Sequence, residues 1–481
     1  MQNTINNTSK FNDIEYDYNV LIANDAGKTL QLTQSAIKML VIDDNVHNPF
    51  SSGYIIIDNS DNALQRAYKN GDDVIEAGFD FNLSERDYVY IDITPKFKST
   101  QKRGDINKDV WNLNYMFIIH DIEDHDTGDV KGNLKKIYLT DVQKFQFMDK
   151  TSKFSTALMQ KGSGIPQYLR DDSDRCEFTG DILKEIIKEA NSSAIFDDSW
   201  DNGSNKVFYT SPANRDYIGD LKYIYDIHQS SVDDDFCILS KQRNTEKWYL
   251  NSFQHIVELA LKQTDKTKAG SELMEAFTIA DSANNNKIPL KSRVPTNYNV
   301  NYNISFGDLS KIEKFDLVEV SKLDKSDFIK TKVAHTYNFD DGKFEINHFD
   351  ISDTKQFYDE KYLGKLKSQK SLLSVGVNQS QNKKIEYAYG CKYSPDNTYE
   401  FLTRNAVLKS QYILSVGIEF ESVGMTHRQS GKFFSIRKDH NYYDNEYEGK
   451  LQGIWYCTNV THVFTESGYT NNISGIKLNI S

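Results

Sequence analysis

The chain has 481 residues, a net charge of -12 and a pI of about 5.4. Such a length predicts about three domains, and the acidic balance argues against nucleic acid as the main partner, because phosphate binding needs clustered Lys and Arg. A hydrophobic content of 38% is low for a compact enzyme. The 29 Tyr and 27 Phe nevertheless argue against disorder, and together with only seven Pro they favour strands over a helical bundle.

Cysteine usage and the N-terminus bear on the compartment. The four cysteines Cys176, Cys237, Cys391 and Cys457 lie far apart without a C-x-x-C pair, which predicts isolated reduced thiols. The start "MQNTINNTSK" lacks the apolar core of a secretory signal. No stretch approaches the ~20 apolar residues of a membrane span. We therefore expect a soluble protein that is made in a reducing cytoplasm.

The N-terminal third is expected to be β-structure. Residues 1–14 are rich in Asn, Thr and Ser and predict a flexible arm. Residues 15–165 then run through strand-like segments such as "YDYNVLIAN", "DYVYIDITPKF" and "NLKKIYLTDVQKFQFM", separated by turn signals such as "NDAGK". Short strands at this spacing predict a first antiparallel β-barrel domain.

Residues 166–298 change to a mixed α/β pattern. The apolar spacing in "CEFTGDILKEIIKEANSSAIF" predicts an amphipathic helix with Thr179 as its N-cap. A second helix follows in "SPANRDYIGDLKYIYDIHQSS", with Ser211 or Asn214 as its cap, and a third short helix is expected over 252–264. Between the last two, "DDDFCILSKQRNTEKWYLNSF" predicts a hairpin with "RNTEK" as its turn. The polar stretch 265–295 is expected to form a surface loop.

The C-terminal part returns to strands. Residues 299–355 predict the first part of a second β-barrel, and 411–481 its remainder. Between them, residues 356–410 predict an insertion or linker, whose basic run over 361–384 is best explained as a solvated segment. The predicted fold class is therefore mainly β with an α+β insertion: two similar antiparallel β-barrel domains and a small α/β region.

Two segments of the chain echo each other. Residues 117–141 and 455–479 each consist of a strand, a polar turn with glycine, and a second alternating strand. Both predict a long hairpin near the end of a β-rich block. The similarity suggests two copies of one barrel within a single chain.

Two stretches resemble the central baseplate hub protein of contractile-tailed bacteriophages. One is "TSPANRDYIGDLKYIYDIHQSSVDDDFCILSKQRNTEKWYLNSF" (210–253), with a loop, an amphipathic helix and a hairpin in succession. The other is "GIWYCTNVTHVFTESGYTNNISGIKLNI" (453–480), the closing hairpin with a V-x-H-x-F pattern and a G-Y turn. The family positions are matched here by Val460, His462, Phe464, Gly468 and Tyr469. "SSGYIIIDN" (51–59) also matches the family's first barrel.

The resemblance implies a structural virion protein, assembled in the host cytoplasm and located in the phage tail baseplate. It implies a homotrimer in which two barrels per subunit form a ring of six, adapting a six-fold tail tube to a three-fold central spike. The implied partners are the tail tube protein, a separate spike protein and baseplate wedge proteins. The chain departs from compact hubs by its additional material at 265–295 and 355–410. A peripheral baseplate or tail-tip adaptor remains an alternative within the same setting.

The stretch "FIIHDIEDHD" (117–126) has the residue types of a metal or catalytic cluster. Strand alternation, however, places Phe117, Ile119, Asp121, Glu123 and His125 on one face and the other candidates on the opposite face. A zinc site needs three or four ligands that converge on one point. We therefore predict a solvated hairpin tip, in which Glu123 and His125 share a face that can meet a neighbouring subunit.

Other candidate motifs have simpler explanations. Arg103, Gly104 and Asp105 predict a turn rather than an adhesion signal. The loop "HNYYDNEYEG" (440–449) predicts a polar hairpin loop rather than a sugar-stacking site. The acidic group Asp171, Asp172, Asp174 and Glu177 is explained by the preference of a helix start for negative charge.

The sequence predicts no catalytic residues, no cofactor and no metal, and hence no enzyme. It contains no G-x-S-x-G, P-loop, H-E-x-x-H or G-x-G-x-x-G motif. A glycan-binding or glycan-degrading β-protein that uses the Tyr-rich loop or the carboxylates is the alternative from a different functional class.

Overall fold

The computed structural model describes residues 3–6, 14–24, 27–32, 35–59, 83–97, 112–124, 134–156, 177–207, 209–232, 235–243, 246–264, 275–279, 300–303, 309–318, 332–338, 343–349, 375–379, 417–438, 453–466 and 468–478. The strands before the first helix are β1 (Asn3–Asn6), β2 (Ile14–Ala23), β3 (Thr29–Leu32), β4 (Ile37–Asn45), β5 (Asn48–Asp58), β6 (Tyr88–Phe97), β7 (Leu113–Asp124) and β8 (Leu134–Asp141).

The elements of the middle region are α2 (Val142–Asp149), β9 (Glu177–Phe178), α3 (Thr179–Ala190), β10 (Ile195–Phe196), β11 (Lys206–Val207), α4 (Tyr217–Ile227), β12 (Cys237–Gln242), β13 (Lys247–Ser252) and α5 (Phe253–Thr264). The strands that follow are β14 (Glu275–Ile279), β15 (Val300–Asn303), β16 (Leu309–Val318), β17 (Lys332–Asn338), β18 (Lys343–Phe349), β19 (Val375–Gln379), β20 (Gly417–Val423), β21 (Phe433–Lys438), β22 (Gly453–Thr465) and β23 (Gly468–Leu478).

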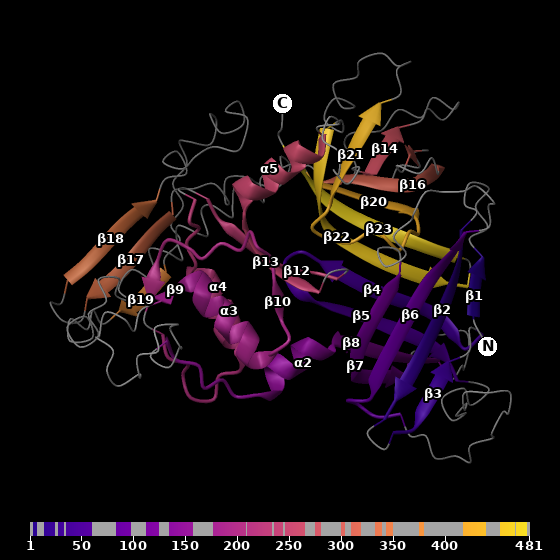
Figure 1. Ribbon diagram of the computed structural model, residues 1–481, viewed down its shortest axis with the longest axis horizontal. Helices are drawn as coiled ribbons and strands as arrows, with labels where there is room; N and C mark the ends of the chain where they lie inside the picture. The colour runs from indigo at the N-terminus through magenta and orange to yellow at the C-terminus, as the bar shows by residue number, and fades with distance from the viewer. Residues whose placement is uncertain are drawn as a thin grey trace.

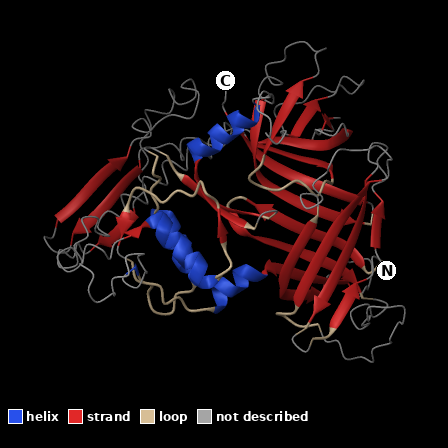
Figure 2. Ribbon diagram, viewed as in Figure 1, coloured by secondary structure: helices blue, strands red, loops and turns tan. Residues whose placement is uncertain are grey.

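The protein is mainly β, as the composition predicted, with strands on both sides of a helical middle region (Figures 1 and 2). Fifteen strands join into one sheet in the order β1-β2-β6-β7-β8-β5-β4-β22-β21-β14-β15-β16-β20-β23, with β3 paired to β2. Its pairings are antiparallel except for the parallel pair β14–β21. Because β22 also pairs with β23, the strands from β14 to β23 in this sheet close into a barrel.

The same strand order occurs twice in this sheet. In the N-terminal half the order β4-β5-β8-β7-β6 is antiparallel throughout. In the C-terminal half the order β16-β20-β23-β22-β21 is also antiparallel throughout. Numbered along the chain, each set follows the same arrangement 1-2-5-4-3. We call these sets the N-terminal and C-terminal β-units.

The two units also share a local irregularity. The hairpins predicted at 117–141 and 455–479 are confirmed as β7–β8 and β22–β23, and they occupy equivalent places in the two units. In each hairpin the first strand carries a bulge, between Ile119 and Asp121 in β7 and between Cys457 and Asn459 in β22. The units differ in their next neighbour, because β2 is antiparallel to β6 whereas β14 is parallel to β21.

The strands form where apolar side chains alternate. In β2, Tyr16, Tyr18, Val20 and Ile22 are all buried, as the two-residue period of a strand requires. They belong to one continuous core to which both β-units contribute. Tyr16, for example, meets the ring of Tyr469 edge-on at 5.0 Å between ring centroids. The two units therefore share a core along the seam where β4 pairs with β22.

The middle region has its own core around Trp248, covered by α3 and α4. Ile182, Leu183, Ile186 and Ile187 of α3 are fully buried, which confirms the predicted amphipathic helix. Both predicted caps are wrong. The N-cap of α3 is Phe178, without a side-chain bond, because Thr179 turns its hydroxyl to the interior. The N-cap of α4 is Asp216, which accepts a hydrogen bond from the Gly219 amide.

Several segments differ from their sequence expectation. The run expected as one strand through Met148 ends at Asp141, whose carboxylate accepts from the Gln143 amide and caps α2. β1 lies within the expected arm and pairs with β2. β14 lies within the expected loop 265–295 and joins the large sheet. β17 and β18 pair with β19 in a separate three-stranded sheet instead of the second barrel.

Candidate functional site

The β12–β13 hairpin reaches from the middle region to the seam between the two β-units (Figure 1). The predicted turn "RNTEK" is confirmed, since the described residues Arg243 and Glu246 follow β12 and precede β13. Glu246 has a positive φ of 53° and forms an ion pair of 2.5 Å with Lys241. This turn places the Arg243 guanidinium where three parts of the chain meet.

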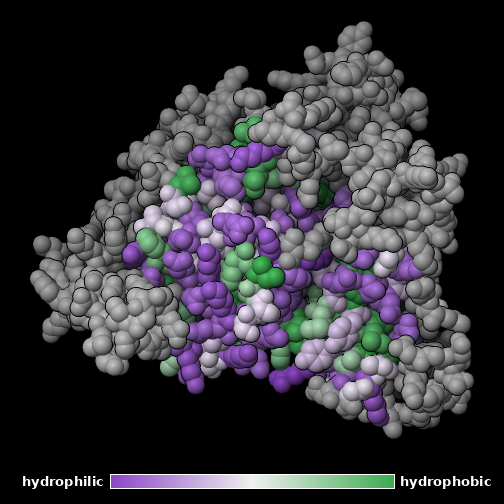
Figure 3. Space-filling view, viewed as in Figure 1, coloured by the Kyte–Doolittle hydropathy of each residue, from purple (hydrophilic) through white to green (hydrophobic). Residues whose placement is uncertain are grey.

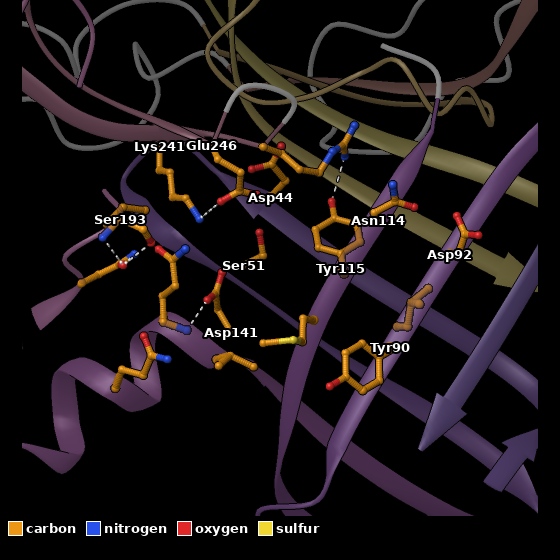
Figure 4. Close-up of a pocket in the computed structure, with 18 residues that line it drawn as sticks. Asp44, Ser51, Tyr90, Asp92, Asn114, Tyr115, Asp141, Ser193, Lys241 and Glu246 are labelled. Carbon is orange, nitrogen blue, oxygen red and sulfur yellow. Dashed lines mark hydrogen bonds and ion pairs between the residues drawn. The ribbon is translucent and has the colours of Figure 1, made fainter. Parts of the chain in front are cut away.

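Arg243 binds to both β-units at once. Its Nη1 donates to the Tyr115 hydroxyl of β7 at 2.8 Å (Figure 4) and lies 3.2 Å from Nε2 of His462 in β22. Its Nη2 donates to the Thr426 carbonyl at 2.9 Å. The planar fork of a guanidinium suits such divergent acceptors. Arg243 therefore connects the middle region with both units through side-chain bonds.

His462 continues this network into the C-terminal unit and is completely buried. Arginine offers only donors, so Nε2 must accept the bond from Arg243, and the imidazole is neutral. Its Nδ1 lies 2.6 Å from the Tyr469 hydroxyl and 3.0 Å from the Asn471 amide nitrogen. Burial, followed by the positive charges of Arg243 and Arg428, holds the pKa of His462 well below 6.5.

Asp44 of β4 supplies the negative charge of the cluster. Its carboxylate accepts from the backbone amide and the hydroxyl of Ser430, each at 3.0 Å. Burial raises the pKa of Asp44, while the charge of Arg243 opposes that shift. Arg428 in turn donates to Asn471 at 2.9 Å. We call this set the seam cluster and define it as Asp44, Tyr115, Arg243, Arg428, His462, Tyr469 and Asn471.

A pocket of about 540 Å³ opens beside the seam cluster, bounded by strands β6 and β7, the start of α2 and the hairpin (Figure 4). Four carboxylates and two cations line it: Asp44, Asp92, Asp141, Glu246, Lys241 and Arg243. Burial raises the pKa of Asp141, against the opposing charge of Lys241. No histidine or cysteine is among the lining residues, and the carboxylates outnumber the cations. The pocket suits a cationic or hydrogen-bonding group better than a phosphate.

The surface around this pocket is uneven in polarity. In Figure 3 hydrophobic side chains gather over the N-terminal unit, whereas the middle region presents mostly polar ones. Tyr90 of β6 and Met116 of β7 are cross-strand neighbours, and 40% and 43% of their surfaces are exposed. Both also line the pocket.

The predicted acid/His stretch lies at the far end of the β7–β8 hairpin. Glu123 accepts from the Tyr138 hydroxyl and Asp124 pairs with Lys135, each at 2.8 Å. The expectation that Phe117 and Glu123 share a face is wrong. The bulge after Ile119 shifts the alternation, so that Ile122 packs against the core and Glu123 is exposed. His125 and Asp126 lie outside the described residues.

Those other sequence candidates that the structure describes are not members of the seam cluster. Glu177 is buried in β9, just ahead of α3. The Arg103–Asp105 turn, the loop 440–449 and Asp171, Asp172 and Asp174 lie outside the described residues. Cys237 and Cys457 are buried and form no disulfide. Within the described part of the chain, no helix has the length and apolarity to cross a membrane.

Sequence reasoning identified His462 and Tyr469 only as parts of a pattern, and it treated Arg243 as an ordinary turn residue. The sequence signal that could have identified His462 is a polar residue within an otherwise apolar strand. His462 stands within the strand "NVTHVF". Val460 and Phe464, two positions before and two positions after it, are both buried. Strand alternation places all three on one face, so a buried histidine that requires a partner was foreseeable.

No family model matches the chain, and no curated protein matches it. Among solved structures, a tail protein from Neisseria meningitidis aligns over 96% of both chains with 9% identity and a TM-score of 0.44. A 43 kDa tail protein of a prophage from Shewanella oneidensis covers 96% of this chain and 100% of its own, with 8% identity and a TM-score of 0.44. A chain of the Francisella PdpA–VgrG complex covers 97% and 59%, with 14% identity and a TM-score of 0.44. TM-scores below 0.5 transfer neither name nor activity.

Proposed function

We propose that the chain is a structural tail protein of a contractile phage, the central baseplate hub, and that it acts without catalysis. In this proposal three copies form a ring that adapts a six-fold tail tube to a three-fold spike. The observation that carries it is the repeated strand order 1-2-5-4-3 in the two β-units. Three chains with two such units each can present six similar surfaces to a tube.

Two further features agree with a load-bearing part. The β4–β22 seam extends one sheet through both units, so that force on one unit passes to the other through backbone hydrogen bonds. The seam cluster adds side-chain bonds across the same junction. A spike would be a separate chain, and wedge proteins would bind at the outside of the ring.

The oligomeric state tests this proposal directly. Light scattering and native mass spectrometry of the full chain at micromolar concentration are expected to give three times 55.4 kDa. Electron microscopy of the same sample is expected to show a three-fold ring with six β-units. A strict monomer in solution, together with isolated tails that lack a ring of this chain, would refute the proposal.

A further inference from the structure

A second polar cluster lies inside the middle region, away from the seam. It consists of Asp201, His228 and Cys237, whose possible ligand atoms all lie within 4.8 Å of one another. The three residues come from different elements. Asp201 lies in the segment between β10 and β11, His228 is the C-cap of α4, and Cys237 begins β12. All three are buried, with exposed fractions of 7%, 3% and 4%.

The carboxylate of Asp201 is held in place before any ligand binds. It accepts from the Gly203 amide at 2.7 Å, the Ser230 hydroxyl at 2.9 Å and the Ser231 amide at 3.0 Å. The Cys237 thiol donates a hydrogen bond to Oδ2 of Asp201, with 3.3 Å between sulfur and oxygen. In a tetrahedral zinc site the bond lengths of oxygen and sulfur place these two atoms about 3.5 Å apart. The observed spacing therefore already approximates that of a bound site.

The imidazole of His228 is oriented by a chain of hydrogen bonds. Asn205 donates to the Ile227 carbonyl and its Oδ1 accepts from the Gln229 amide, which fixes its amide orientation. The Thr179 hydroxyl must then donate to that Oδ1, at 2.7 Å. Nδ1 of His228, 2.9 Å from the same hydroxyl, is left to donate its hydrogen. In the neutral ring the lone pair is therefore on Nε2. A metal-binding histidine has the same arrangement, with one ring nitrogen free to bind the ion and the other donating a hydrogen bond to a neighbouring group.

Gly203 closes the site from behind the imidazole. Its φ of 87° favours glycine, and a Cβ there would lie 2.9 Å from both Cε1 of His228 and Oγ1 of Thr179. The backbone thus packs directly on the ring and restricts its rotation. The Asp201 carboxylate and the His228 ring are therefore both held in place by their neighbours.

We propose that Asp201, His228 and Cys237 bind one zinc-class divalent cation. Carboxylate, imidazole and thiolate are the oxygen, nitrogen and sulfur donors that zinc accepts. Binding replaces the thiol proton: the S–H bond breaks, a sulfur–metal bond forms and one proton is released to solvent. Two anionic ligands and one neutral ligand then balance a charge of +2, so the buried assembly carries no net charge. The ion would link α4, β12 and the segment before β11. This proposal does not rest on the hub function.

Tag-free full-length protein tests the site. The metal-free wild type is titrated with Co²⁺ as a spectroscopic substitute for Zn²⁺, and one equivalent is expected to produce a sulfur-to-cobalt charge-transfer band. Zn²⁺ is expected to remove the band and to raise the melting temperature. A wild-type protein that gives no band and no change in melting temperature overturns the proposal, whatever the variants do.

Matched variants assign the ligands. Cys237→Ser is expected to lose the band, whereas Cys457→Ser removes the other described buried thiol and is expected to keep it. Thr179→Val removes the bond that orients His228 and is expected to weaken Co²⁺ binding about 10- to 100-fold while keeping the band at saturation. A band of unchanged intensity and affinity in Cys237→Ser would overturn the assignment.

Discussion

At the scale of single residues, His462 gives the molecule a defined response to acid. Its folded pKa is depressed below 6.5 by burial and by the charges of Arg243 and Arg428. Below pH 6.5 the unfolded chain gains a proton at this site and the folded chain does not, so the free energy of unfolding decreases. The contribution of His462 to the free energy of unfolding is fully present above pH 6.5. It decreases by at most about 1.4 kcal/mol per pH unit as the pH falls toward the folded pKa.

His462→Gln is therefore expected to flatten that slope, because glutamine does not titrate and can still accept from Arg243. Urea unfolding of both proteins at a series of pH values below 6.5 measures the difference. The same substitution at the exposed His120, His120→Gln, is the matched control against which the change in slope is compared. Equal slopes for wild type and His462→Gln would show that His462 is protonated in the folded state as well.

The sequence could indicate that His462 is polar within an apolar strand, but not which group it meets. Its partner Arg243 is 219 positions away along the chain, and no local pattern links a turn residue to a distant strand. No local pattern links the members of the second cluster either. Asp201, His228 and Cys237 are spread over 37 positions, without the short spacing that is typical of metal ligands. Residue-scale chemistry here depends on the tertiary fold.

At the scale of elements, the start of α4 depends on Asp216. Its carboxylate satisfies the Gly219 amide at 2.7 Å, one of the amides that a helix start leaves without a helical partner. Asp216→Ala is expected to lower the free energy of unfolding by about 1 kcal/mol, as measured by thermal or chemical denaturation. Asp198→Ala removes the same charge from an exposed turn and is expected to have a smaller effect. Equal losses would attribute the effect to charge instead of capping.

Periodicity predicted the existence of α3, α4, α5 and both hairpins, because each buries one apolar stripe. It failed where a single residue changes the local geometry. One residue inserted after Ile119 reverses which face the rest of β7 presents. In the same way, the carboxylate of Asp141 ends β8 and begins α2 within one residue, since it caps the amide of Gln143. Such switches depend on side-chain hydrogen bonds that hydrophobic spacing does not record.

At the scale of the whole molecule, the echo between 117–141 and 455–479 predicted the duplication, and the two hairpins occupy equivalent positions in the two β-units. The sequence did not predict that the units join into one sheet. Pairing of β4 with β22 connects residues more than 400 positions apart, and both strands are apolar enough to belong equally well to separate barrels. The parallel pair β14–β21 was also hidden, because β14 lies in a segment of polar composition.

The joined sheet makes Arg243 a determinant of how the two units unfold. Arg243→Met keeps most of the side-chain volume but removes the bonds to Tyr115, His462 and the Thr426 carbonyl. Loss of one partner from such a buried charged network is expected to cost about 3 kcal/mol. Hydrogen exchange is expected to accelerate in β7, in β22 and around Thr426 together, because one side chain holds all three.

Lys247→Met, which removes an ion pair of 3.8 Å from the same hairpin, is expected to cost less than about 1 kcal/mol. Faster exchange in the hairpin alone would mean that the β4–β22 pairing holds the units without Arg243.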